Sequence, residues 1–249
     1  MTIMPGAEPI SLDGSEVGVV LCHGYPSTPQ SMRGWAEHLA AAGYSVRVPR
    51  LPGMGTRWQD LNATGWQDWY GELEIAYEQL ARRCGTIFAA GLSMGGLLAT
   101  KLAQEKPALA GLVLANPIFA HNHPALRVLP MLRYVLPSLG GIIGDIKKPE
   151  TVELGYNRNP LRSMYSQTLL WKIVVDDLPQ LNLPILLFTS LEDHVVPALS
   201  WQTFLNRVGS DDLTHLVLEN SYHVATLDND AELIFEESVR FIERLTPRD

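Results

Sequence analysis

The stretch T-I-F-A-A-G-L-S-M-G-G-L-L-A-T-K-L-A, residues 86–103, decides the fold. It begins as a short apolar run, typical of a buried strand, and continues with the leucine and alanine spacing of a buried helix. The pattern G-x-S-x-G at residues 91–95 therefore lies at a strand-to-helix junction. Such a junction predicts a nucleophile elbow, a tight and strained turn that holds the hydroxyl of Ser93 above a sheet. Glycines flank the turn because a Cβ atom there would collide with the neighbouring strand and helix.

Strand and helix patterns alternate on both sides of this junction. Besides the strand that ends at the turn, we expect strands at 17–21, 44–48, 112–115, 185–189 and 216–218. Helices are expected at 27–42, 66–80, 200–208 and 231–245. We expect residues 1–15 to be a loose lead-in or a fragment of an edge strand. Six strands with intervening helices predict an α/β fold, with a doubly wound and mostly parallel sheet.

Two of these helices begin at sequences typical of a cap. Ser27 has Gln30 three positions later, and Asn229 has Glu232 three positions later. In a capping box of this spacing, the first side chain accepts a hydrogen bond from the main chain of the first turn and the second reaches back. We therefore expect Ser27 and Asn229 to cap the first and the last helix.

The alternation breaks at residues 119–178, which are rich in proline and leucine. Apolar residues cluster there without a regular period, and Gly140-Gly141 stands among them. We interpret this segment as an insertion. The rest of the chain, residues 1–118 and 179–249, is expected to form one core.

The composition limits the partners and the location. The 249 residues carry a formal net charge of −8, which argues against nucleic acid as a partner. The first residues have neither a basic leader nor an apolar core, and no uncharged apolar run reaches the roughly 18 residues of a membrane span. We therefore expect a cytoplasmic protein. Cys22 and Cys84, the two cysteines, lack the spacing of a metal site and are expected to be buried free thiols.

A serine hydroxyl needs a base, and the base needs an acid that orients it. His223 is the favoured base because it lies in the loop between the last strand and the last helix, from which it can reach back to the turn. Asp193 is the favoured acid because it follows the strand at 185–189 and fits the chain order Ser, Asp, His of this fold. We interpret Glu192 as a solvated acid and His194 as a bystander. The other histidines are better explained as surface, core or loop residues: His23, His38, His121, His123 and His215.

The oxyanion that develops during acyl transfer needs two hydrogen-bond donors. One is the main-chain N–H of Met94, directly after the nucleophile, and the second is expected from the loop after the strand at 17–21. Tyr25 lies in that loop and supplies the second N–H. Gly24 allows a close approach of the backbone, and His23 is expected to hold the loop in shape.

These residues together resemble the α/β-hydrolase superfamily, and within it the small bacterial carboxylesterases and monoacylglycerol lipases. The segments that carry the resemblance are His23-Gly24-Tyr25, Pro52-Gly53-Met54-Gly55-Thr56, Gly91-Leu92-Ser93-Met94-Gly95-Gly96, Asp193-His194-Val195-Val196-Pro197 and Ser221-Tyr222-His223-Val224. The resemblance implies the α/β-hydrolase fold, with the insertion as a small helical cap that lines an acyl-chain tunnel. It also implies Ser93, His223 and Asp193 as the catalytic triad and Tyr25 and Met94 as oxyanion donors.

Two positions depart from the family pattern. Met54 stands where many relatives have histidine between the glycines, and Asn157 stands where members specific for glycerol esters often carry an acidic residue. The resemblance therefore leaves a preference for monoacylglycerols open.

The sequence predicts a serine hydrolase that cleaves short-to-medium acyl esters through an acyl-enzyme and needs neither a metal nor another cofactor. The same triad also serves thioesterases, amidases, C–C hydrolases and acyltransferases, and a non-catalytic binding protein of this fold is a further alternative. The expected partner is a small-molecule ester. Contact with a membrane is at most transient and made through the cap, where Arg127, Arg133, Lys147 and Lys148 gather. The oligomeric state is not defined by the sequence.

Overall fold

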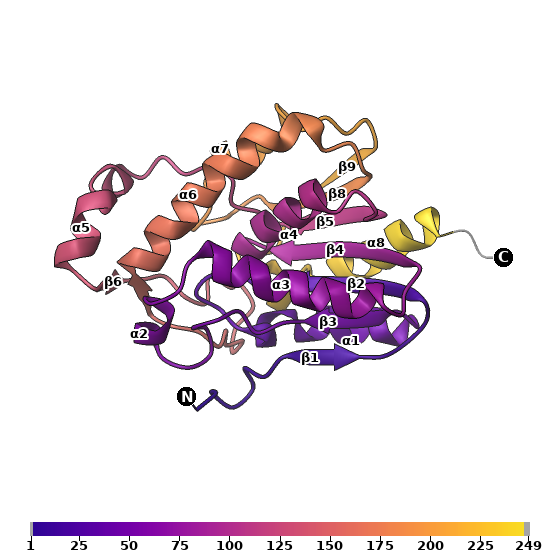
Figure 1. The fold of residues 1–249 in the computed structure, drawn as a ribbon, viewed down its shortest axis with the longest axis horizontal. Coiled ribbons are helices and arrows are strands. Elements are labelled where there is room, and N and C mark those ends of the chain that lie inside the picture. The colour runs from indigo at the N-terminus through magenta and orange to yellow at the C-terminus, as the bar shows by residue number, and fades with distance from the viewer. Residues whose placement is uncertain (1, 247–249) are drawn as a thin grey trace.

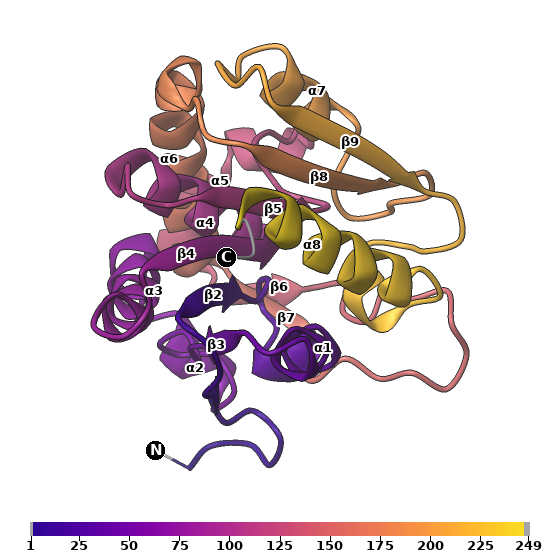
Figure 2. The same ribbon diagram turned by 90° about the vertical axis from the view of Figure 1, so that its right-hand side faces the viewer.

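A seven-stranded sheet runs through the middle of the molecule. The computed structural model describes residues 2–246. The strands lie in the order β1-β3-β2-β4-β5-β8-β9, and Figure 2 shows the succession from β3 to β9. Every neighbouring pair is parallel except β1 with β3. The bounds are Ile10–Leu12 for β1, Val17–Cys22 for β2, Ser45–Val48 for β3, Thr86–Leu92 for β4, Gly111–Ala115 for β5, Ile185–Ser190 for β8 and Leu213–Leu218 for β9.

The predicted sheet is confirmed, with one extension at each edge. The leading residues contain the short edge strand β1. Strand β9 begins at Leu213, three residues before the predicted start, because it lies at the other edge and is only partly buried. An edge strand does not need the continuous apolar run that a strand covered on both faces has.

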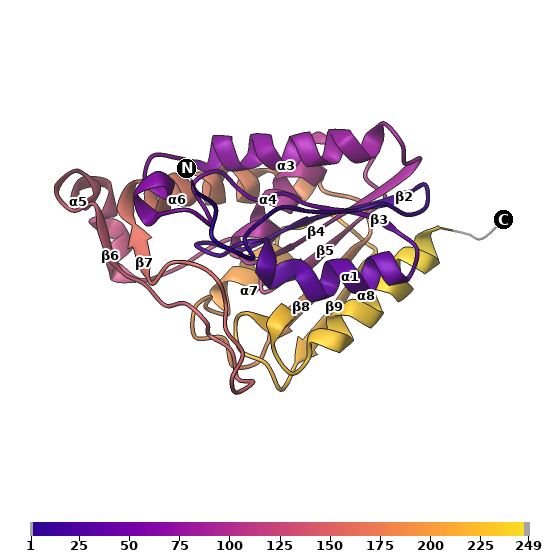
Figure 3. The same cartoon turned by 90° about the horizontal axis from the view of Figure 1, so that it is seen from below.

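Helices cover both faces of the sheet. Figure 3 shows α1 (Arg33–Ala41) and α8 (Ala231–Leu245) on one face, and α3 (Trp66–Ala81), α4 (Met94–Glu105) and α6 (Leu161–Asp177) on the other. The short helices α2 (Trp58–Leu61) and α7 (Leu199–Leu205) complete the core. A doubly wound arrangement thus agrees with the prediction.

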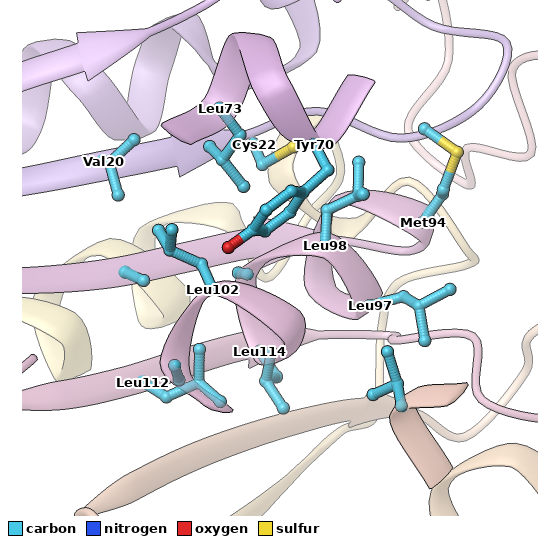
Figure 4. Packing of buried hydrophobic residues seen from close by; sticks show 14 of the residues in the cluster. Val20, Cys22, Tyr70, Leu73, Met94, Leu97, Leu98, Leu102, Leu112 and Leu114 are labelled. Carbon is cyan, nitrogen blue, oxygen red and sulfur yellow. The ribbon is translucent and has the colours of Figure 1, made fainter. Parts of the chain in front are cut away.

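Two apolar layers hold the helices to the sheet. Between the sheet and α3 and α4, Tyr70 and Leu73 meet Leu98 and Leu102 above the strands (Figure 4). Leu98 is fully buried, and burial of such a side chain stabilises the fold by roughly 1.5–3 kcal/mol. The layer under α1 and α8 includes Trp35, Leu39, Phe88, Ile234 and Phe241. Cys22 and Cys84 are buried and unbridged, as predicted.

Neither predicted capping box forms. The first helix starts with a 3-10 turn at Pro29–Met32 whose cap residue is Thr28, and the side chain of Gln30 turns to the insertion. There its amide donates to the carbonyl of Val152 and accepts from the N–H of Leu154, both at 3.0 Å. The last helix has Asp230 as its cap residue, and Asn229 donates to the carbonyl of Asn220 instead. Partners distant in sequence outweigh the local pattern at both sites.

The insertion extends beyond the carboxyl end of β4, where α5 and β6 lie (Figure 1). It contains a 3-10 turn (Pro124–Arg127), α5 (Leu129–Val135), and the antiparallel strands β6 (Ser138–Gly140) and β7 (Arg158–Pro160), followed by α6. Residues 141–157, called the strap below, connect β6 to β7 without helix or strand. The second half of α6 buries Leu170 and Val174 in the core layer of α3 and α4. The boundary at residue 178 stays a prediction.

No helix in the described part of the chain is long and apolar enough to cross a membrane.

Candidate active site

Ser93 occupies a strained turn between β4 and α4. Its φ of 56° and ψ of −119° are unusual for a residue with a side chain. A Cβ atom on Gly91 would lie 2.3 Å from the main chain of Gly95, and one on Gly95 would lie 2.0 Å from the carbonyl oxygen of Cys22. Only glycine fits at these positions, because main-chain atoms of β2 and α4 approach so closely. The local geometry is that of the predicted elbow.

One pocket at the carboxyl end of the sheet brings three of the predicted residues together. Its wall includes Ser93 from the elbow, His223 from the loop before α8, and Tyr25 from the loop after β2. The strap supplies further lining residues, among them Ile142 and Glu153. With Val195 from the loop after β8, segments from five parts of the sequence meet in the wall of this pocket.

His223 and Asp193 form a buried pair. His223 Nδ1 lies 2.8 Å from Asp193 Oδ2, and both side chains are more than 90 % buried. The other carboxylate oxygen accepts the main-chain N–H groups of Val195 and Val196, at 2.8 and 2.7 Å. Because an ionised carboxylate can only accept, Nδ1 carries the proton and Nε2 is left free to accept one.

Burial and charge act against each other on this pair. Burial lowers the pKa of His223, but the charge and hydrogen bond of Asp193 outweigh it, and the pKa lies above the usual 6.5. Burial raises the pKa of Asp193, but the charge of His223 and the hydrogen bonds it accepts outweigh it, and the pKa lies below 3.8. Asp193 is therefore ionised at neutral pH, and it favours the protonated form of His223.

The loop after β2 packs directly on the elbow. A Cβ atom on Gly24 would lie 3.3 Å from the Cβ of Ser93. Met94 is the first residue of α4, where main-chain N–H groups have no partner inside the helix. The Tyr25 hydroxyl lies 2.9 Å from Ser163 Oγ, at the start of α6, so its side chain fixes the loop to the insertion. Both N–H groups expected to bind an oxyanion are thus at the elbow or in the loop packed on it.

His23 holds this loop in shape, as predicted. The ring is fully buried. Its Nδ1–H donates to the Gly24 carbonyl at 2.9 Å, and its Nε2 accepts the N–H of Leu51 at 3.3 Å. Burial lowers the pKa of His23 to about 4, so the ring is neutral at physiological pH. With both nitrogens engaged, His23 has a structural role.

Sequence reasoning missed two carboxylates of the strap. Glu153 and Asp145 both line the pocket, whereas the position singled out for an acidic residue was Asn157. The pocket therefore does contain acidic residues, and Glu153 stands four positions before Asn157. No signal in the sequence could have found it, because the insertion lacks a period that would orient its side chains.

The other titratable groups take different partners. His121 lies 3.2 Å from the carbonyl of Val195, and His215 lies 2.8 Å from the hydroxyl of Thr189. His194 Nδ1 lies 2.8 Å from the carboxylate of Asp145 in the strap. Within residues 2–246, no three His, Cys, Asp or Glu side chains are grouped so that they could hold a metal ion.

Comparison with known proteins places this geometry in context. The model of the family described as serine aminopeptidase, S33, matches residues 15–230. A thermostable monoacylglycerol lipase of Bacillus sp. (strain H-257) is 40% identical over 244 residues, 96% of this chain and 95% of that protein. A carboxylesterase of Bacillus subtilis (strain 168) is 25% identical over 96% of this chain and 97% of its own.

Solved structures agree with these relatives. One from work on LipS and LipT, two metagenome-derived lipolytic enzymes, superposes with a TM-score of 0.95 at 40% identity, and the match covers 98% of this chain and 100% of the other. A monoacylglycerol lipase of Paleococcus ferrophilus gives a TM-score of 0.82 at 19% identity, with 99% and 100% covered, and shows the common fold.

Proposed function

Because the chain belongs to the serine aminopeptidase S33 family, we propose that Ser93 is the nucleophile, His223 the general base and Asp193 the orienting acid of a carboxylic ester hydrolase. Ester hydrolysis agrees with the relatives, a monoacylglycerol lipase and a carboxylesterase. The observation that carries the assignment of residues is the buried His223–Asp193 hydrogen bond of 2.8 Å, in the wall of the pocket that Ser93 also lines.

The proposed reaction has two halves. His223 Nε2 takes the proton of the Ser93 hydroxyl while Oγ attacks the ester carbonyl, and the alcohol leaves with that proton. Water then attacks the acyl-enzyme, again with His223 as base, and releases the acid. The main-chain N–H groups of Tyr25 and Met94 stabilise the oxyanion in both halves, and loss of one such donor raises the barrier by roughly 3 kcal/mol.

Thioesters, amides and carbon–carbon bonds could be cleaved by the same triad, and acyl transfer differs only in the acceptor. The named relatives favour esters over these substrates. The buried His223–Asp193 pair disfavours a binding protein without activity. Desolvation of two buried charged groups costs stability, and a catalytic role accounts for a pair that is kept despite this cost.

We further propose monoacylglycerols as substrates, with Glu153 as the residue that accepts a hydrogen bond from a free hydroxyl of the glycerol. Glu153 lines the pocket, and its carboxylate accepts the N–H of Gly144 at 2.9 Å. Ile142 and Ile143 line the same pocket and offer an apolar surface to the acyl chain.

Replacement of Glu153 by glutamine is expected to lower kcat/KM for a monoacylglycerol by about 10- to 100-fold, since a hydrogen bond to a charged group is worth roughly 1.5–3 kcal/mol. A p-nitrophenyl ester of the same acyl chain should change less than about threefold, because it has no hydroxyl to bind. Both rates are measured on the alkaline plateau of the wild-type pH profile. Glu150→Gln makes the same change on the exposed part of the strap and should leave both rates unchanged. Equal losses on both esters would contradict the role of Glu153.

We propose that the insertion acts as a cap that touches a lipid surface reversibly. On α5, Met131 is 73% and Val135 is 78% exposed, and Arg133 lies on the same helix. Apolar and basic side chains of this kind favour the interface of an anionic membrane.

The two buried free thiols also agree with a location in the reducing cytoplasm.

Joint replacement of Met131 and Val135 by aspartate should reduce co-sedimentation with anionic phosphatidylglycerol vesicles about tenfold or more. Turnover of a water-soluble short-chain ester should be retained. Ile75→Asp is the matched control, because Ile75 is 53% exposed on α3, outside the insertion. If wild type and the double variant sediment equally, the apolar face of α5 does not bind membranes.

A further inference from the structure

We infer that Asp145, in the strap, is a positioning residue for the catalytic histidine. This inference rests on the proposed function, in which His223 is the base. Asp145 holds the loop of His223 and the loop of Asp193 at the same time, and so makes the geometry of the triad depend on the insertion.

The Asp145 carboxylate accepts three hydrogen bonds from the two triad loops. Its Oδ2 accepts the main-chain N–H of His223 at 3.1 Å and that of His194 at 3.2 Å. Its Oδ1 lies 2.8 Å from His194 Nδ1, which must carry a proton to donate. The side chain of Asp145 is 11% exposed, whereas that of His194 is 54% exposed. The largely buried partner is thus the carboxylate that contacts the main chain of the base itself.

Further contacts of the strap fix the loop on both sides of His223. The Asp145 carbonyl accepts the N–H of Val224 at 3.1 Å. Asp228 accepts the N–H groups of Lys147 and Lys148, at 2.7 and 2.8 Å, and that of Tyr222 at 2.8 Å. Figures 2 and 3 show the strap passing beside the loop that precedes α8. The loop of His223 therefore cannot move unless the strap moves with it or these hydrogen bonds break.

The other end of the strap is attached to the loop that follows Tyr25. The N–H of Tyr156 donates to the Pro26 carbonyl at 3.3 Å. A Cβ atom on Gly155 would lie 2.6 Å from that same oxygen, so the two segments are in direct contact. Gln30 anchors the strap nearby through Val152 and Leu154. The strap therefore connects the loop of Tyr25 to the loop of His223.

Asp145 also adds charge to the surroundings of His223. Burial lowers the pKa of His223, and the charges of Asp193, Glu153 and Asp145 raise it. Asp193 comes from the loop after β8, and the other two come from the strap. The wild-type acid limb of kcat/KM, which follows deprotonation of His223, is therefore expected above pH 6.5, the usual pKa. Removal of the Asp145 charge should move that limb to lower pH.

The test compares Asp145→Asn and Asp145→Ala with wild type on a p-nitrophenyl ester. Alanine removes the acceptor of both main-chain N–H groups. Asparagine can keep both on its Oδ1 and donate its NH2 group to His194 Nδ1 in the other tautomer, so it removes mainly the charge. We expect kcat of Asp145→Ala to fall about 10- to 100-fold with KM within about threefold, because misplacement of the base affects the chemical step. The acid limb should move to lower pH, and the rate of Ser93 labelling by a fluorophosphonate should fall in parallel with kcat.

Glu192→Gln is the matched control. Glu192 pairs with Lys147 at 3.0 Å and so also links the strap to the loop of Asp193, but this pair is half exposed. Its variant should keep wild-type kcat and pH profile. Rates are expressed per active site by titration with the fluorophosphonate, so that unfolded protein is not counted.

A per-site kcat of Asp145→Ala within about threefold of wild type, or an acid limb that neither variant moves, overturns the inference. Failure of the proposed function gives a different result, since Ser93→Ala or His223→Ala would then retain turnover whatever Asp145 does.

Discussion

Replacement of Ser93 by alanine is expected to lower kcat for p-nitrophenyl ester hydrolysis by about four to six orders of magnitude. Without Oγ no acyl-enzyme can form, and the remaining pocket offers only oxyanion binding and positioning. The melting temperature should be equal to that of wild type or higher, because alanine removes one hydroxyl and leaves the turn in place. Steady-state kinetics and calorimetry on the same preparations measure both quantities.

A serine outside the pocket provides the control for this variant. Ser210 bonds to the Leu183 carbonyl before β9, and Ser210→Ala should retain full turnover. Fluorophosphonate labelling followed by peptide mapping should modify Ser93 in wild type and Ser210→Ala, and no residue in Ser93→Ala. Substantial turnover of Ser93→Ala would refute the proposed nucleophile.

Gly95→Ala is expected to cause the largest loss of stability among single substitutions at the elbow. The new Cβ would lie 2.0 Å from the Cys22 carbonyl oxygen and 2.6 Å from that of His23. Main chain cannot rotate away as a side chain can, so β2 and α4 must separate. We expect the free energy of unfolding to fall by about 3 kcal/mol or more. This loss outweighs the gain of about 1 kcal/mol that alanine brings to a helix in place of glycine.

Gly71→Ala isolates that helical gain. Gly71 lies in α3, and a Cβ atom there would have no neighbour within 4 Å. The variant should be more stable than wild type by about 0.5–1 kcal/mol. Urea denaturation of both variants measures the contrast. An unfolding midpoint of Gly95→Ala equal to that of wild type would show that β2 and α4 are not locked together.

Most of the sheet could be predicted because buried parallel strands are apolar throughout. Strands β2, β4, β5 and β8 are buried along nearly their whole length and were found within one residue of their bounds. Strand β9 was predicted too short, since its exposed edge admits polar residues. The caps at Ser27 and Asn229 were wrong because Gln30 and Asn229 find distant partners that a local pattern does not contain.

The candidate triad followed from topology rather than from local structure. A parallel sheet gathers its carboxyl ends at one edge, so chain order alone relates Ser93, Asp193 and His223. The strap is not part of the sheet, so this rule does not predict where its side chains lie. Asp145 meets partners 49 and 78 positions away, and it does so from a segment without helix or strand. Side chains in such a segment follow no period, so Asp145 and Glu153 could be identified only from the structure.

The hydrogen bonds at both ends of the strap bear on how this chain can be recombined with its relatives. A graft that exchanges residues 119–178 as a module would replace Asp145 together with the segment that carries the Tyr156 N–H. Crossovers placed inside β6 and β7, with residues 141–157 kept native, would retain both. Chimeras of the second kind are the ones we expect to stay active, so the exchangeable unit is smaller than the insertion.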